Sequence, residues 1–130
     1  MPTNKELSKY RLEQAERCLK SAKTLLNDED YKSTANRSYY CVFHCMRSLL
    51  ALENLDFKRH SGVISYFREK YIKTKIFDTK LSSILDVLFQ IRSSSDYDDF
   101  YIVSKEDITE QIANAEYFLS QIKTYLERQN

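Results

Sequence analysis

The chain has 130 residues, with 20 Lys and Arg against 19 Asp and Glu. This length suits one domain, and the near-zero net charge excludes the strongly basic balance of typical nucleic-acid-binding domains, so any such binding must use a local patch. One glycine and one proline leave little material for tight β-turns, and the composition therefore predicts an all-α protein.

The first half of the chain predicts two long helices. Apolar side chains recur every three or four positions over residues 6–26, which indicates an amphipathic helix. Residues 27–30 form a short acidic turn whose side chains suit the start of a second helix over residues 31–53. Residues 54–60 are the first irregular connection, and they lead into a short helix that runs to about Tyr71.

The second half predicts two more long helices. Asp78 can cap a helix that ends near Arg92, and a polar loop is expected over residues 93–101. Ser104, with Asp107 three positions later, is a variant capping box that opens the last helix. Short connections between amphipathic helices predict an antiparallel up-and-down four-helix bundle with one additional short helix.

No linker, repeat or low-complexity tract interrupts this pattern, so we expect a single helical domain over residues 1–130 with its core at about 7–126. No apolar run approaches the length of a membrane span, and the N-terminus lacks the apolar core of a signal peptide. The three cysteines lack paired metal-ligand spacing, and Cys41 and Cys45 are expected to be packing residues. We therefore expect a cytoplasmic protein with no membrane partner, no metal site and no cofactor.

The second predicted helix has an unusual polar flank beside its apolar face. Five side chains on this flank fall within about 100° of each other: Asn36, Arg37, Tyr40, His44 and Arg47. A helix that only packs would usually carry solvated Lys and Glu here, whereas these groups hydrogen-bond, stack and change protonation state. The flank predicts a binding surface for a phosphate-bearing or aromatic ligand, although His44 can also be read as a structural histidine.

Arg92 is the second anomaly, because it lies near the middle of an apolar helical face. A guanidinium cannot lose its proton, so at this position it needs a partner or an anionic ligand. One interpretation is an internal salt bridge to Asp96, Asp98 or Asp99 at the end of the helix. The other is that Arg92 binds a phosphate, with Asp96 one turn later to orient it.

A small basic cluster, Lys58, Arg59 and His60, precedes the short helix. Backbone donors at a helix start, together with these cations, favour an anion, which makes His60 a candidate ligand-binding residue. The alternative is a solvated loop in which Ser61 caps the helix.

Three segments together resemble the HEPN domain (higher eukaryotes and prokaryotes nucleotide-binding) in its small stand-alone prokaryotic branch. They are residues 36–44 (NRSYYCVFH), residues 58–64 (KRHSGVI) and residues 92–101 (RSSSDYDDFY). The resemblance extends from about Leu7 to Leu126. It implies a helical bundle that forms a homodimer, binds a nucleotide or RNA, and is encoded beside a minimal nucleotidyltransferase as a toxin–antitoxin-type pair.

One departure from the resemblance concerns catalysis. Ribonuclease members of the superfamily carry an arginine followed, after about four to six residues, by a histidine, but here Tyr97, Asp98 and Asp99 occupy those positions. Arg92 and Asp96 are therefore the candidate catalytic residues of a ribonuclease toxin with a degenerate motif. Arg92 can stabilise the phosphate charge, but no aligned base is available to deprotonate the 2′-oxygen.

Tyr97 is also a candidate ligand-binding residue. In related toxin–antitoxin pairs the nucleotidyltransferase modifies a tyrosine near the motif, which makes Tyr97 and Tyr101 candidates for regulation by a bulky anionic adduct. A rival interpretation from another functional class is a non-catalytic helical protein-interaction module, in which Arg92 is locked in a salt bridge.

Overall fold

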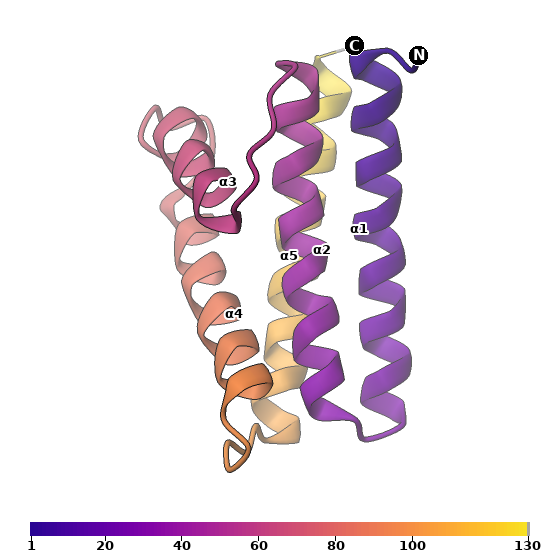
Figure 1. Ribbon diagram of the computed structural model, residues 1–130, viewed down its shortest axis with the longest axis vertical. Helices are drawn as coiled ribbons and strands as arrows, with labels where there is room; N and C mark the ends of the chain where they lie inside the picture. The colour runs from indigo at the N-terminus through magenta and orange to yellow at the C-terminus, as the bar shows by residue number, and fades with distance from the viewer. Residues whose placement is uncertain (130) are drawn as a thin grey trace.

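The computed structural model describes residues 1–129, and this part of the chain contains α-helices and no strand. The α-helices are α1 (Asn4–Asn27), α2 (Tyr31–Leu52), α3 (His60–Phe67), α4 (Thr79–Tyr97) and α5 (Lys105–Arg128), and a π-helical turn, η1 (Arg68–Ile72), follows α3. Figure 1 shows the long helices α1, α2, α4 and α5 running up and down, with the start of α1 and the end of α5 at the same end of the bundle. The predicted all-α bundle with one additional short helix is confirmed.

Side-chain caps account for most of the helix starts. The Asp30, Asp78 and Ser104 side chains each accept a backbone N–H of the helix that follows, as their sequence positions predict. At α1, Thr3 and Glu6 form a reciprocal capping box that the sequence analysis missed. The start of α3 differs, because Arg59 is its N-cap and makes no side-chain bond. The interpretation of Ser61 as the cap is therefore wrong.

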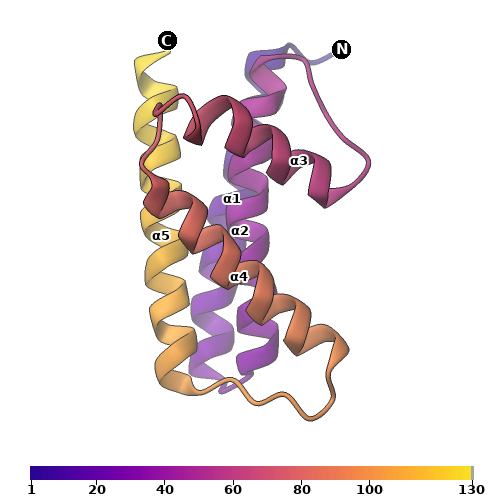
Figure 2. The ribbon, with the colours of Figure 1, turned by 90° about the vertical axis from the view of Figure 1, so that its left-hand side faces the viewer.

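Two central helices, α2 and α5, contact helices on both sides. α1 packs on both of them from one side, while α4 packs on both from the other and α3 covers part of α2. Figure 2 shows α4 crossing the bundle diagonally, with α3 above it at the end where the chain termini lie. This crossing brings side chains of α3 and α4 to the polar flank of α2.

The core is one large apolar cluster with a smaller satellite. Its largest fully buried side chains come from α2, α3, α4 and α5 and include Tyr39, Phe67, Phe118 and Met46. Complete burial of such a side chain stabilises the fold by about 1.5–3 kcal/mol. The satellite joins Ala35, Val103 and Ile108, with Tyr101 packed against it, and so attaches the α4–α5 connection to the bundle.

The main correction to the sequence analysis concerns the end of α4. Serines are weak helix formers, so the loop was expected to begin at residue 93, but α4 continues to Tyr97. Burial of Ser95, which is 7% exposed, shows that packing against the bundle overrides this local preference. Asp96 therefore lies on the same helix as Arg92, one turn further on. Phe89, one turn after the buried Leu85 on α4, is 43% exposed at the margin of the apolar face.

Within residues 1–129, no helix is both long enough and apolar enough to cross a membrane.

Candidate functional site

The guanidinium of Arg92 lies against two tyrosine rings of α2. Its central carbon is 5.3 Å from the centre of the Tyr39 ring and 5.5 Å from that of Tyr40, within the range of cation–π attraction. Its Nη2 also donates to the Tyr40 hydroxyl at 3.4 Å. The Arg92 side chain is 17% exposed, so a permanent positive charge is held at a nearly buried position beside aromatic rings.

Asp96 is the carboxylate partner of Arg92. Its Oδ2 lies 2.9 Å from Arg92 Nε, one helical turn away on α4, and the Asp96 side chain is 30% exposed. The contact is an ion pair without a hydrogen bond, because the buried Nε has no hydrogen-bond partner in the described residues. Of the five N–H donors of this guanidinium, one is used within residues 1–129, by Tyr40, and the buried Nε–H faces Asp96. The three remaining donors, on Nη1 and Nη2, can bind an anion.

His60, the first residue of α3, joins the same cluster. Its Nδ1 lies 3.0 Å from the Tyr39 hydroxyl, and its ring centre is 4.0 Å from Phe43 and 5.7 Å from Tyr40. Burial lowers the pKa of His60, and the positive charges of Arg92 and Arg47 lower it further. The imidazole is therefore predominantly neutral at neutral pH, and in the tautomer whose Nδ1 donates to the Tyr39 hydroxyl its Nε2 can accept a proton.

A partly exposed ion network holds the connection that precedes His60. Asp56 accepts hydrogen bonds from Arg47 Nη2 at 2.9 Å and from Arg11 Nη2 at 3.3 Å, and Arg11 Nη1 donates to the Arg47 carbonyl. Gly62 permits a close approach of Phe57, because a Cβ at position 62 would lie only 3.0 Å from the Phe57 Cβ. These contacts set where α3 begins.

Arg11 and Asp56 were not predicted as site residues from the sequence. A signal for Arg11 was present, because it shares a helical stripe with Ala15, Cys18 and Ala22, all buried. An arginine on such a stripe needs a partner for the same reason as Arg92. Asp56 lies in the irregular connection between α2 and α3. No helical repeat there indicates which way its side chain points.

His44 lies one helical turn after Tyr40 on α2 and packs beside its ring. Its ring centre is 6.0 Å from that of Tyr40, and its Nδ1 is buried with no hydrogen-bond partner in the described residues. Burial lowers the pKa of His44 to about 4, with further contributions from Arg47 and Arg37. His44 is consequently neutral at physiological pH.

Asn36 and Arg37 extend the cluster along α2. Arg37 donates to Asn36 Oδ1 from Nε at 3.1 Å and from Nη2 at 2.7 Å, and its guanidinium carbon is 5.3 Å from the centre of the Tyr40 ring. Arg37 and Arg92 therefore share one aromatic ring. Asn36, Arg37 and Asp96 also line a hollow of about 340 Å³.

Tyr97 is the predicted site residue that the fold does not bring into the cluster. It is 78% exposed and makes no aromatic contact or side-chain hydrogen bond within residues 1–129. The structure thus brings together seven of the eight predicted site residues: Asn36, Arg37, Tyr40, His44, His60, Arg92 and Asp96.

Unpaired buried polar atoms also occur on the helices that carry the cluster. In the described part of the chain, four buried side-chain atoms lack a hydrogen-bond partner: Ser38 Oγ, His44 Nδ1, Arg92 Nε and Ser95 Oγ. All four belong to α2 or α4. Such atoms are uncommon in folded proteins, and their presence on these two helices is consistent with a polar site.

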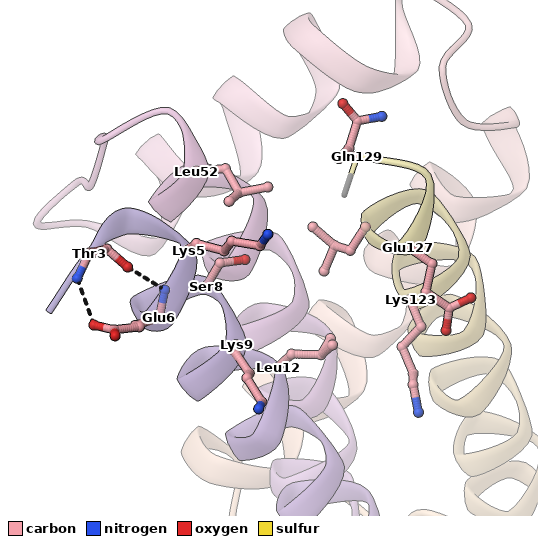
Figure 3. A pocket seen from close by; sticks show the side chains of 11 residues that line it. Thr3, Lys5, Glu6, Ser8, Lys9, Leu12, Leu52, Lys123, Glu127 and Gln129 are labelled. Carbon is pink, nitrogen blue, oxygen red and sulfur yellow. Dashed lines mark hydrogen bonds between the residues drawn. The ribbon is translucent and has the colours of Figure 1, made fainter.

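A larger hollow, of about 590 Å³, lies at the end of the bundle where the termini meet. Figure 3 shows Lys5 and Lys9 of α1 and Lys123 of α5 around the apolar side chains of Leu12 and Leu52. Its lining includes no histidine, cysteine or arginine, and it shares no residue with the Arg92 cluster. The described residues contain no group of three or more His, Cys, Asp or Glu that could hold a metal ion. The three cysteines are buried and free.

An all-α bundle with a cationic and aromatic cluster between α2 and α4, its second and third long helices, defines the class of this protein. The family model of the HEPN domain matches residues 8–125, and the chain belongs to that family. The chain is 32% identical over 97% of its length to "Putative toxin MJ0142" of Methanocaldococcus jannaschii, of which 85% is covered. It is also 32% identical over 98% of its length to a UPF0332 protein of Thermotoga maritima, of which 96% is covered. A third relative, "Putative toxin MJ0605" of M. jannaschii, is 30% identical over 88% of this chain and 85% of its own.

Proposed function

We propose that this protein binds a nucleotide or RNA at the Arg92 cluster and is the toxin-type member of a pair with a minimal nucleotidyltransferase. The observation that carries the proposal is the Arg92 guanidinium beside the Tyr40 ring, with three Nη donors unused in the described residues. A phosphate needs such donors, and a nucleobase can stack on an aromatic ring. The relatives named as toxins support the toxin part of the proposal.

In this proposal each side chain has a defined role. Arg92 binds the phosphate, and Asp96 orients the guanidinium from the same helix. Tyr40 offers a stacking surface, and neutral His44 packs beside its ring. Asn36, Arg37 and His60 line the same side of α2. Tyr97 would be reached only by a ligand or partner that extends past the end of α4.

A specific observation also favours ribonuclease activity as a second candidate function. His60 is neutral and lies beside the rings that hold Arg92, so it could accept the 2′-hydroxyl proton that the degenerate motif leaves without a base. The 2′-oxygen would attack phosphorus to form a 2′,3′-cyclic phosphate, and the P–O5′ bond would break as water protonates the leaving oxygen.

The proposal includes a homodimer and a cytoplasmic location. Apolar side chains exposed on and after α4, namely Val87, Phe89, Phe100 and Ile102, support an interface with a second copy or with the nucleotidyltransferase. Sedimentation at micromolar concentration tests the homodimer, and a clean monomer would contradict it.

Binding is tested with labelled RNA and with nucleotides, comparing wild type with Arg92→Ala. Arg17→Ala is the matched control, because Arg17 is exposed on α1 and forms no salt bridge within residues 1–129. We expect Arg92→Ala to abolish binding while Arg17→Ala retains it. If wild type neither binds nor cuts, and Arg92→Ala only melts earlier, the protein is an interaction module instead. Cyclic-phosphate product that forms in the presence of a chelator and is lost in His60→Gln would support the nuclease.

A further inference from the structure

A hollow beside the Arg92 cluster is rich in hydrogen-bond donors. It has a volume of about 340 Å³ and is lined by Leu25, Lys32, Ser33, Asn36, Arg37 and Asp96. Four of these side chains carry N–H or O–H donors, and the single carboxylate, Asp96, is paired with Arg92. Counting Arg92 with the lining, three positive charges face one negative charge.

Arg37 differs from the other buried or half-buried arginines in having no carboxylate partner within the described residues. In the described residues, Arg11, Arg47, Arg68 and Arg92 each pair with a carboxylate, whereas Arg37 has none within ion-pair distance. Its guanidinium donates only to the neutral Asn36 amide and weakly to Cys18 Sγ at 3.9 Å. A half-buried cation without an anionic partner is a candidate for binding an anion from outside the chain.

Lys32 brings a second unpaired cation to the same hollow. Lys32 Nζ donates to the Asp98 carbonyl at 3.5 Å, a long contact with a neutral group, and it forms no salt bridge within residues 1–129. The contact leaves its ammonium charge uncompensated and its other N–H groups free.

The hollow adjoins the Arg92 site through Asp96 and Arg37. Asp96 lines the hollow and pairs with Arg92, and the guanidinium carbons of Arg37 and Arg92 lie 5.3 Å and 5.5 Å from the centre of the same Tyr40 ring. Two cationic positions beside one aromatic ring match the two phosphates and the base of a short stretch of a single nucleic-acid strand.

We infer that the site takes a single-stranded oligonucleotide with at least two phosphates. One phosphate binds Arg92, a base lies against Tyr40, and the neighbouring phosphate enters the hollow between Lys32 and Arg37. This inference rests on the proposed function and deepens it, because a mononucleotide would occupy only part of the site. The carboxylate of Asp96 does not oppose the second phosphate strongly, since Arg92 compensates its charge.

The test compares AMP with the dinucleotide pApA by calorimetry at two salt concentrations. We expect wild type to bind pApA at least tenfold more tightly than AMP. Lys32→Ala should weaken pApA binding by about fivefold and leave AMP binding unchanged. Arg37→Gln should weaken pApA binding by at least as much, and because Arg37 also lies against Tyr40 it should weaken AMP binding by a smaller factor. Each should also reduce the salt dependence of pApA binding by about 0.7 in the log–log slope. Lys20→Ala, an exposed lysine of α1 that forms no salt bridge within the described residues, is the matched control and should change neither ligand.

The outcomes separate this inference from the proposed function. Equal affinity for AMP and pApA, with both lost in Arg92→Ala, would overturn the second phosphate position and leave the proposed function intact. If neither ligand nor a longer single strand binds wild type, both fail. Because Arg37 is half-buried, a thermal melt accompanies each variant. The decisive variant is Lys32→Ala, in which loss of pApA binding counts only when AMP binding and the melting temperature are retained.

Discussion

Arg92 and Tyr40 are separated by 52 positions in the chain, yet Arg92 Nη2 is 3.4 Å from the Tyr40 hydroxyl and the guanidinium carbon is 5.5 Å from the ring centre. This relationship links α4 to α2. It holds the cation by packing on an aromatic face more than by the hydrogen bond, which is long. Mutation of Tyr40 can separate the contribution of the aromatic ring from that of the hydroxyl hydrogen bond.

Tyr40→Phe removes the hydroxyl and keeps the ring. We expect the free energy of unfolding to change by less than about 1 kcal/mol, because a hydrogen bond of this length contributes little. Tyr40→Ala also removes contacts with Tyr39, Phe43 and both guanidinium groups, and should cost about 2–4 kcal/mol. Urea denaturation measures both values. Equal losses in the two variants would show that the hydroxyl, not the ring, holds Arg92.

Asp96→Asn tests whether the Arg92 ion pair is structural or functional. The Asp96 side chain is 30% exposed and forms an ion pair without a hydrogen bond, so we expect a loss of stability below about 1 kcal/mol. Nucleotide affinity should change by a larger factor, because the carboxylate orients the guanidinium.

Asp99→Asn is the control for that variant, since Asp99 is exposed and makes no side-chain hydrogen bond or salt bridge within the described residues. A buried structural bridge would instead lose about 3–5 kcal/mol in Asp96→Asn, with affinity per folded molecule unchanged. That result would contradict the functional assignment of Asp96.

Asp56→Asn should be more damaging, although Asp56 is the more exposed acid. Its side chain is 46% exposed, but it balances Arg11, whose side chain is only 11% exposed, and also Arg47. Removing the acid leaves the Arg11 charge nearly buried and unpaired, and we expect a loss of about 2–3 kcal/mol. Asp86→Asn is the matched control, because Asp86 pairs with Arg68 at the surface and should lose less than about 1 kcal/mol. A similar loss in the two variants would refute the structural role of Asp56.

The stability of the protein should fall with acid before its carboxylates titrate. The folded-state pKa of His44 is about 4, below the ordinary value of 6.5, so the unfolded chain takes up this proton first as the pH falls. The stability due to neutral His44 is complete above pH 6.5 and is lost between about pH 6.5 and pH 4, by at most about 3 kcal/mol. The lowered pKa of His60 acts in the same direction.

His44→Gln should flatten this part of the pH profile when unfolding by urea is measured at several pH values. His60→Gln should remove only the smaller contribution of His60. A wild-type profile that is flat between pH 6.5 and pH 4.5 would show that His44 is not buried as a neutral side chain.

Local sequence patterns determined most of the helical architecture. The three- and four-residue apolar repeat and the acidic and serine caps depend on neighbours within one or two turns, so the positions of the long helices and the caps Asp30, Asp78 and Ser104 could be predicted. The anomaly of Arg92 on an apolar stripe could also be recognised, because a fixed charge on such a face is unusual in any fold.

The assembly of the site was decided by tertiary structure. Packing extended α4 past its serines and placed Asp96 beside Arg92, and the diagonal crossing of α4 set Arg92 against Tyr39 and Tyr40. His60 lies 21 positions from Tyr39 and reaches it only because the Asp56 network and Gly62 fix the start of α3. Helical periodicity gives the face on which a side chain lies, but it contains no information on the angle or offset between helices. Those quantities follow from how the whole core packs, and they determine which predicted residues meet and which, like Tyr97, remain apart.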